Sequence, residues 1–158
     1  MSGLGSAIGR VFSRWVPGLQ RPEPRVQSGV LPYRIVDGRV EYLLITSRRS
    51  KRWLFPKGGL MKGMTPWESA AQEALEEAGV EGTVETTPIG SYDGALNDRW
   101  ATPVTVEVYP LHVEVQHKYW QEQAQRRRAW MTADKARERI DDPQKRAIID
   151  AFEARLVN

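Results

Sequence analysis

Residues 58–80 read GGLMKGMTPWESAAQEALEEAGV, a glycine-rich turn that runs directly into a helical pattern. A T-x-x-E capping box begins at Thr65, and Pro66 follows it at the first helical position, where the missing N–H of proline costs nothing. Gly79 can end the helix, because glycine adopts the left-handed backbone conformation more readily than any other residue. Together these signals predict a helix from Pro66 to Ala78.

One face of this helix should be small and apolar, and the opposite face acidic. The apolar side gathers Trp67, Ala70, Ala71, Ala74, Leu75 and Ala78. At about 100° per residue, Glu73 and Glu76 lie opposite that side and Glu77 lies at its border. Carboxylates at positions i, i+3 and i+4 repel one another, but a divalent cation such as Mg²⁺ would turn that repulsion into binding. A solvated acidic face is the plainer interpretation of any two of these glutamates.

At these residues the chain resembles the Nudix hydrolase family, whose signature is G-x5-E-x7-R-E-U-x-E-E-x-G-U, where U is a bulky aliphatic residue. Gly58 matches the first glycine, and Glu73, Glu76 and Glu77 match the three glutamates of the second half without a gap. The resemblance implies an α/β fold, a Nudix-type α/β/α sandwich around a mixed β-sheet. It also implies an enzyme that hydrolyses a phosphoric anhydride with Mg²⁺, or with Mn²⁺ in its place.

The resemblance assigns site residues as well. It implies that Glu73, Glu76 and Glu77 are catalytic, and that they bind the metal together with the backbone carbonyl of Gly58 or of the next glycine. A metal held in this way would neutralise charge on the phosphate oxygens and activate a water. The general base is either one of the signature glutamates or Glu122, in the later segment HKYWQEQ. For Glu122 an ordinary surface acid is the plainer interpretation.

Two positions depart from the signature. Met64 stands where the family has its first glutamate, and Gln72 where it has arginine. In the family these two commonly support each other as an ion pair, and the loss of one partner alone would leave an uncompensated charge. We interpret the change as the joint replacement of a supporting pair in an active enzyme. The alternative is a catalytically weakened Nudix-fold protein that binds a nucleotide or a partner without hydrolysis.

A basic segment, SRRSKRWLFPK at residues 47–57, lies just before the glycine turn. Arginine can grip phosphate through two parallel hydrogen bonds, and lysine acts as a point charge. A solvated basic turn explains any single residue, but as a group the cations are candidate substrate ligands. The candidates are Arg48, Arg49, Lys51, Arg52 and Lys57. This local excess of positive charge favours a densely anionic substrate.

The expected substrate class rests on a less specific resemblance. GVLPYR near the start and the R-x-W pattern at Arg128–Trp130 are similar to the diphosphoinositol polyphosphate phosphohydrolase group, over roughly residues 27–153. FPKGG is also similar to the diadenosine polyphosphate hydrolases and the RNA 5′-pyrophosphohydrolases. We expect a small phosphorylated substrate: a nucleoside diphosphate linked to another group, a dinucleoside polyphosphate or an inositol pyrophosphate. An RNA 5′ end is less favoured. The run Arg126–Arg128 fits a basic strand edge and a substrate contact equally well.

Length and composition bound the organisation of the chain. Its 158 residues include no cysteine and no apolar run that could span a bilayer. We expect one Nudix hydrolase domain over residues 26–158, with no membrane partner and a cytoplasmic location. Residues 1–25 combine arginines with glycines and prolines. We expect them to form a flexible or partner-docking N-terminal segment, and a targeting presequence is the alternative.

Apolar alternation and turn signals predict the remaining elements. Strands are expected at 29–36, 40–46, 53–55, 83–92 and 102–115, turns at Asp37–Gly38 and Asp93–Gly94, and helices at 132–140 and 143–156, the last one capped by Asp142. His112 should be packed and His117 exposed. Aromatic residues later in the chain fit nucleobase stacking and ordinary core or rim positions equally well. They are Tyr92, Trp100, Tyr119 and Trp120.

Overall fold

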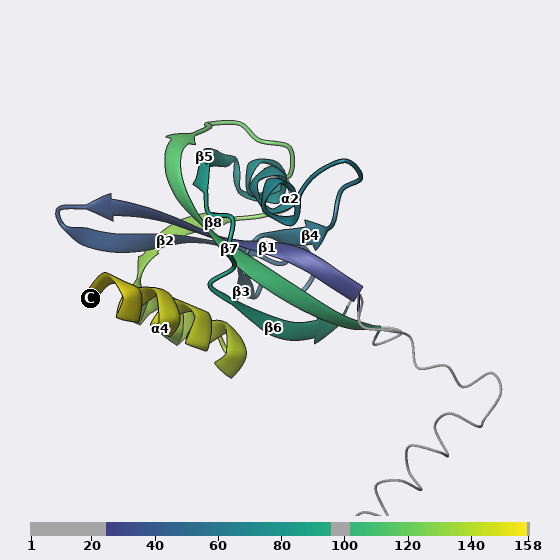
Figure 1. Ribbon diagram of the computed structural model, residues 1–158. Coiled ribbons are helices and arrows are strands. Elements are labelled where there is room, and N and C mark those ends of the chain that lie inside the picture. The colour runs from purple at the N-terminus through teal and green to yellow at the C-terminus, as the bar shows by residue number, and fades with distance from the viewer. Residues whose placement is uncertain (1–24, 96–101, 158) are drawn as a thin grey trace, which may run out of the picture.

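The computed structural model describes residues 25–95 and 102–157. In this part of the chain one mixed sheet lies between helices on both faces (Figure 1). The strands are β1 (Arg25–Val36), β2 (Arg39–Thr46), β3 (Trp53–Leu54), β4 (Lys57–Gly59), β5 (Val80–Val84), β6 (Gly90–Ala95), β7 (Pro103–Gln116) and β8 (Arg128–Thr132). The helices are α2 (Pro66–Glu73), its π-helical continuation η1 (Ala74–Ala78), α3 (Ala133–Arg139) and α4 (Pro143–Val157).

The sheet is mixed because its two longest strands run parallel. β1 and β7 pair in parallel, whereas the other strand pairs in the described residues are antiparallel. The strand order is β3-β2-β1-β7-β5, while β4 pairs with β1, β6 with β7, and β8 with β2. This arrangement confirms the predicted α/β/α sandwich around a mixed β-sheet.

Each face of the sheet carries its own core. On the face covered by α2 and η1, the fully buried Ala70, Ala74 and Ala78 pack against strand residues that include Leu43 and Tyr109. On the other face α4 contributes Ile148, Ile149 and Phe152. Figure 1 shows α2 and α4 on opposite sides of the sheet. The alanine stripe thus brings the helix axis close to the sheet and fixes the direction of the acidic side chains.

Most predicted elements are confirmed. Asp37 and Gly38 have φ values of 51° and 75°, the positive pair expected for a tight hairpin between β1 and β2. Thr132 and Ile140, the expected ends of the penultimate helix, are the residues that flank α3. The carboxylate of Asp142 accepts the N–H of Gln144 at 2.9 Å at the start of α4, as a capping residue should.

Two predictions near residue 90 are wrong. The strand expected at 83–92 is divided into β5 and β6, because Val84 pairs with Leu111 but Gly90 pairs with Val108. The chain from Val84 to Gly90 contains more residues than the opposite stretch of β7, from Leu111 to Val108. The extra residues cannot pair with β7, so the chain leaves the sheet between β5 and β6. The turn expected at Asp93–Gly94 is absent, since both residues continue β6 along β7.

The N-terminal prediction falls almost entirely outside the described residues. Residues 1–24 are not described, and Arg25, which we assigned to the N-terminal segment, is the first residue of β1. Trp100 also lies outside the described part. No helix in the described ranges is long and apolar enough to cross a membrane.

Candidate active site

The helix that carries the signature glutamates is fixed at both ends. At its start the Thr65 hydroxyl accepts the N–H of Glu68 at 3.2 Å, and the Glu68 carboxylate accepts the N–H of Thr65 at 2.9 Å, which completes the predicted capping box. At its end Gly79 has a φ of 68°. The last turn, Ala74–Ala78, is π-helical rather than α-helical. A π turn is a wider turn that recurs at functional sites, and here Glu77 becomes the most buried of the signature glutamates.

The glycine-rich segment is held against this helix by short polar contacts. Lys57–Gly59 forms the strand β4, which pairs with β1. The Ser69 hydroxyl accepts the N–H of Met61 at 3.0 Å, and the Ser28 hydroxyl donates to the carbonyl of Pro66 at 2.7 Å. The carboxylate of Glu73 packs directly against the backbone of Gly58, in the space that a Cβ atom at that position would need. Strand and helix therefore form two adjacent walls.

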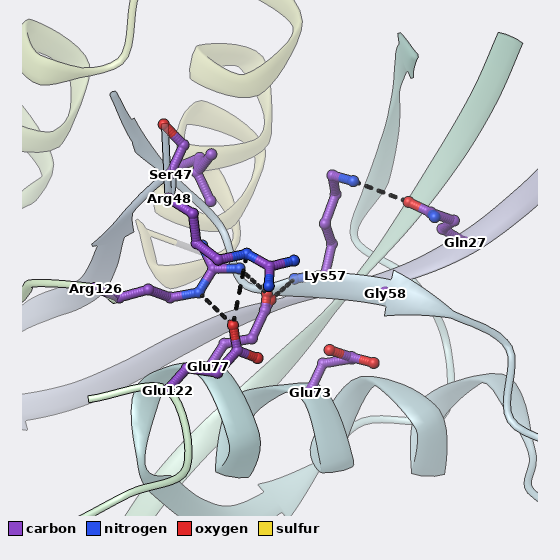
Figure 2. Close-up of a pocket in the computed structure, with 10 residues that line it drawn as sticks. Gln27, Ser47, Arg48, Lys57, Gly58, Glu73, Glu77, Glu122 and Arg126 are labelled. Atoms are coloured by element: carbon purple, nitrogen blue, oxygen red, sulfur yellow. Dashed lines mark hydrogen bonds and ion pairs between the residues drawn. The ribbon is translucent and has the colours of Figure 1, made fainter. Parts of the chain in front are cut away.

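A cavity of about 400 Å³ opens between these walls and the end of β2. Figure 2 shows acidic and basic side chains facing each other across it. Its lining residues are Gln27, Ser47, Arg48, Leu54, Lys57, Gly58, Glu73, Glu77, Glu122 and Arg126. These residues come from β1, the β2–β3 turn, β3, β4, the signature helix and the segment between β7 and β8. The cavity is therefore assembled from distant parts of the chain.

A buried ion-pair network lies at the centre of the cavity. Nη2 of Arg126 lies 3.2 Å from Oε1 of Glu77, and Nε of Arg126 donates to Oε1 of Glu122 at 3.0 Å. Nη1 of the same guanidinium donates to the carbonyl of Thr46 at 3.0 Å. The side chains of Arg126 and Glu77 are only 8% and 4% exposed. Figure 2 draws dashed contacts from this guanidinium to Glu77 and Glu122.

The segment that supplies Glu122 and Arg126 is fastened over the end of the signature helix. The indole N–H of Trp120 donates to the carbonyl of Glu77 at 3.1 Å, and the N–H of Glu122 donates to the carbonyl of Glu76 at 3.1 Å. The guanidinium of Arg128 lies 3.8 Å from the ring centroid of Trp120 and donates to the carbonyl of Ala78 at 2.8 Å. These contacts satisfy carbonyls at the helix end and hold the segment to η1.

Burial and repulsion shift the titration of the carboxylates in the cavity. Burial, followed by repulsion from Glu77, Glu76 and Glu122, raises the pKa of Glu73 to about 8. Burial also raises the pKa of Glu77 to about 7, although Arg126 acts in the opposite direction. The site therefore crowds more negative charge into a low-dielectric space than the protein alone balances.

The predicted basic residues divide into two groups. Lys57 and Arg48 line the cavity. Nζ of Lys57 donates to Oε1 of Gln27 at 3.0 Å, and burial lowers the pKa of Lys57 although Glu77 opposes the shift. Arg49, Lys51 and Arg52 do not line it; they lie exposed on the turn between β2 and β3. Within the described part of the chain these three make no ion pair with a carboxylate.

Glu76 is also separate from the cavity. Its side chain is half-buried and does not line the cavity, whereas Glu73, Glu77 and Gly58 do. Its proposed role in metal binding and catalysis therefore stays a prediction. Glu122, our later-segment candidate for the general base, does line the cavity and is paired with Arg126.

Three polar residues of the cavity were not among the predicted site residues. Arg126 belonged to a run of three arginines for which a basic strand edge and a substrate contact fitted equally well, while Gln27 and Ser47 were not assigned any role. Gln27 lies on β1 and reaches the cavity because β4 pairs there. Ser47 follows directly after β2. The local sequence holds no signal for either residue, since only strand pairing brings them to the site.

The two histidines, Tyr92 and Trp120 make contacts within the fold, whereas Tyr119 is 73% exposed. His112, expected to be packed, is exposed and stacks on Tyr33 with ring centroids 5.0 Å apart. His117, expected to be exposed, is half-buried and pairs with Glu81. Tyr92 is a core residue that is 3% exposed, and Trp120 is covered by Arg128. Neither aromatic ring is presented for stacking on a base.

The donor set of the cavity fits a hard divalent cation. Oxygen ligands from carboxylates and a backbone carbonyl are those that Mg²⁺ prefers, and Glu73, Glu77, Glu122 and Gly58 can supply them from three sides. Among the described residues, no three acidic or histidine side chains already converge on one point. Binding of an ion would therefore draw the carboxylates together and offset the repulsion that raises the pKa of Glu73.

Comparison with known proteins agrees with this geometry. A model of the NUDIX domain family matches residues 25–152. Nudix hydrolase 17 of Arabidopsis thaliana is 34% identical over 160 residues, which cover 97% of this chain and 84% of the relative. Nudix hydrolase 18 of the same plant is 35% identical, over 97% of this chain and 87% of the relative.

The same comparison corrects the expected location. Both plant relatives are named as mitochondrial proteins. The prediction of a cytoplasmic protein is therefore wrong. It rested on the absence of cysteine and of a spanning segment, and neither feature separates the cytoplasm from another compartment without disulfides.

Solved structures share the fold. A NUDIX hydrolase from Nitrosomonas europaea superposes with a TM-score of 0.68 at 20% identity, over 84% of this chain and 90% of that one. The Ap4A hydrolase of C. elegans superposes with a TM-score of 0.61 at 21% identity, over 84% of this chain and 98% of that one. The matched domain, the sandwich fold and the acidic cavity on the signature helix show that the chain belongs to the Nudix hydrolase family.

Proposed function

We propose that this Nudix hydrolase cleaves a phosphoric anhydride in a phosphate-rich small molecule with the help of Mg²⁺, which Mn²⁺ could replace. The candidate substrates are a nucleoside diphosphate linked to another group, a dinucleoside polyphosphate and an inositol pyrophosphate. One observation carries the proposal: a single cavity places the carboxylates of Glu73 and Glu77 opposite the cations Arg48 and Lys57. A cavity lined by carboxylates alone would favour binding of a metal ion, and a cavity lined by cations alone would favour binding of a phosphate. A cavity that has both favours a phosphate compound bound together with a metal ion.

Each wall has a distinct task. Glu73 and Glu77, with the backbone of Gly58, would hold the metal on the helix side. When bound, the metal would neutralise charge on the phosphate oxygens and acidify a water. Lys57 and Arg48 would bind phosphate oxygens from the strand side. These residues thereby fix the anhydride in line for attack, which is the main requirement of phosphoryl-type displacement.

Glu122 is the candidate for the general base. Its carboxylate lines the cavity, and Oε1 accepts a hydrogen bond from Nε of Arg126 at 3.0 Å, which fixes its direction. The side chain is 18% exposed, so water can reach it. A signature glutamate remains the alternative base.

The relatives and structural neighbours support a substrate of this kind. The plant relatives are named as hydrolases, and one neighbour is named as an Ap4A hydrolase. The exposed cations Arg49, Lys51 and Arg52 lie on the same β2–β3 turn that supplies Arg48. Such a patch favours a substrate with several phosphates over one with few.

A substrate panel tests the proposal. Inositol pyrophosphates, dinucleoside polyphosphates, nucleotide sugars, ADP-ribose and 5′-triphosphorylated RNA are incubated with the protein, and phosphate or mononucleotide release is measured with Mg²⁺ and with EDTA. We expect Mg²⁺-dependent cleavage of at least one compound and its loss in Glu77→Gln. If no compound is cleaved although ligands still bind, the chain is a binding protein and the hydrolase proposal is wrong.

A further inference from the structure

The two oxygens of the Glu77 carboxylate are held by two different donors. Oε1 is bound by Nη2 of Arg126 at 3.2 Å, and Oε2 accepts the backbone N–H of Lys57 at 3.3 Å. A carboxylate oxygen has two lone pairs, so each oxygen keeps one lone pair for another ligand. The contacts fix the direction of the carboxylate without consuming its capacity to bind a cation.

The Arg126 guanidinium reaches three acceptors at once. Beside Glu77 it binds Glu122 at 3.0 Å through Nε and the carbonyl of Thr46 at 3.0 Å through Nη1. The planar fork of arginine presents donors in these fixed directions, whereas a lysine ammonium on its flexible stem is a single point charge. The position therefore makes use of properties that only arginine has.

The backbone around Arg126 is as well fixed as its side chain. The N–H of the next residue, Arg127, donates to Oγ1 of Thr46 at 2.9 Å, and its carbonyl accepts the N–H of Thr46 at 3.0 Å. The guanidinium of Arg127 lies near Trp53, with 6.0 Å between its carbon and the ring centroid. Arg127 is not among the residues that line the cavity. Of the two adjacent arginines, Arg126 contacts the carboxylates of the cavity and Arg127 packs near Trp53 outside it.

The signature itself supplies no such support. Gln72 stands at the position of the signature arginine, and no hydrogen bond of its side chain is found among the described residues. Met64, at the position of the first signature glutamate, is 43% exposed. Within the described residues, Arg126 is thus the cation that forms an ion pair with a signature glutamate.

We propose that Arg126 is a positioning residue that holds the carboxylates of Glu77 and Glu122 in the orientation that the metal and the attacking water require. The segment between β7 and β8 would thereby provide, from the far side of the cavity, the support that position 72 lacks. The proposal rests on the proposed function for its catalytic part. Its metal-binding part stands independently of any substrate.

The main test uses Arg126→Gln and measures Mn²⁺ binding by electron paramagnetic resonance. Partners of metal ligands commonly change affinity by roughly 10- to 100-fold, so we expect Mn²⁺ affinity to fall at least about tenfold. With the substrate that the native protein cleaves best, kcat should fall while KM at saturating metal changes little. A substrate-binding arginine would give the opposite pattern, with a raised KM and unchanged Mn²⁺ affinity, and that result would overturn the proposal.

Two further variants keep the test decisive. Arg127→Gln removes the same charge one residue away, at a side chain that does not line the cavity. Its Mn²⁺ affinity should stay within about twofold of the native value, because salt screens charges that do not contact the site. Any effect of net charge alone would appear in both variants. Arg126→Lys keeps the charge and lowers the risk of unfolding, which buried unpaired carboxylates create. It should fold, as judged by circular dichroism, with Mn²⁺ affinity below the native value because it cannot serve both glutamates. Native affinity in Arg126→Lys, or tighter Mn²⁺ binding in Arg126→Gln, would contradict the proposal.

Failure of the function and failure of this inference give different results. If the native protein cleaves no compound but Arg126→Gln still binds Mn²⁺ weakly, the proposed reaction is wrong and the positioning role is kept. If the native protein cleaves a substrate and Arg126→Gln binds Mn²⁺ normally, the reaction is kept and the positioning role is wrong.

Discussion

The Glu73 carboxylate fills the space beside Gly58 in which any larger residue would place its Cβ atom. Gly58→Ala should therefore displace the Glu73 carboxylate, which lies at the end of a flexible side chain and can move away. We expect Mn²⁺ affinity to fall and the midpoint of thermal unfolding to change little. Gly59→Ala is a matched control, since nothing lies within 4 Å of a Cβ atom there. Equal effects of the two substitutions would show that the contact with Glu73 has no role.

Replacing Glu77 with glutamine should remove a metal ligand while keeping the shape of the side chain. We expect kcat to fall by orders of magnitude in Glu77→Gln, with little change in circular dichroism, because Arg126 keeps its contacts with Glu122 and Thr46. Glu81→Gln, an exposed acid that pairs with His117, is the control and should keep native turnover. Turnover of Glu77→Gln within a few fold of native would remove Glu77 from the mechanism.

The raised pKa of Glu73 makes the metal-free protein sensitive to pH. The folded pKa is about 8 against an ordinary value of 4.5, so between these values the folded state binds more protons than the unfolded state. Stability must then fall as pH rises through this window. We expect urea unfolding in EDTA to show a lower free energy of unfolding at pH 8.5 than at pH 5, and a smaller difference in Glu73→Gln.

Addition of Mg²⁺ is the complementary measurement. A bound cation should restore stability at pH 8.5 in the native protein, because a ligand that binds only the folded state stabilises it. A pH dependence that is the same in Glu73→Gln and in the native protein would assign the effect to other groups.

The exposed cations of the β2–β3 turn should act on substrate charge rather than on chemistry. Neutralising Arg49, Lys51 and Arg52 together is expected to raise KM most for the substrate with most phosphates and to leave kcat nearly unchanged. The effect should shrink with added salt, since exposed charges are screened. The same loss of charge at Arg39, Lys135 and Arg139, away from the cavity, is the control. An equal rise in KM for all substrates would remove the argument for a polyphosphate.

The sequence predicted the parts of the site that are encoded locally. The capping box at Thr65, the alanine stripe and the left-handed Gly79 fix one helix through neighbouring residues, and all three are confirmed. The location of Gln27 and Arg126 could not be predicted, because it depends on which strands pair across the sheet. The turn at Asp93–Gly94 failed for the same reason, since pairing with β7 outweighed a local turn preference.

The parallel pairing of β1 with β7 also has a consequence for the order of folding. Gly29 pairs with Val108, which lies far from it along the chain. The glycine strand β4 pairs with β1, so it can take its place only after β1 is ordered. Pairings between residues far apart in sequence form slowly, because loop closure must precede them. Metal binding should therefore develop only in the last phase of refolding, after helical circular dichroism has recovered, as stopped-flow measurements can show. A chain that has begun to fold but has not finished would then be unable to hydrolyse the cell's phosphate compounds.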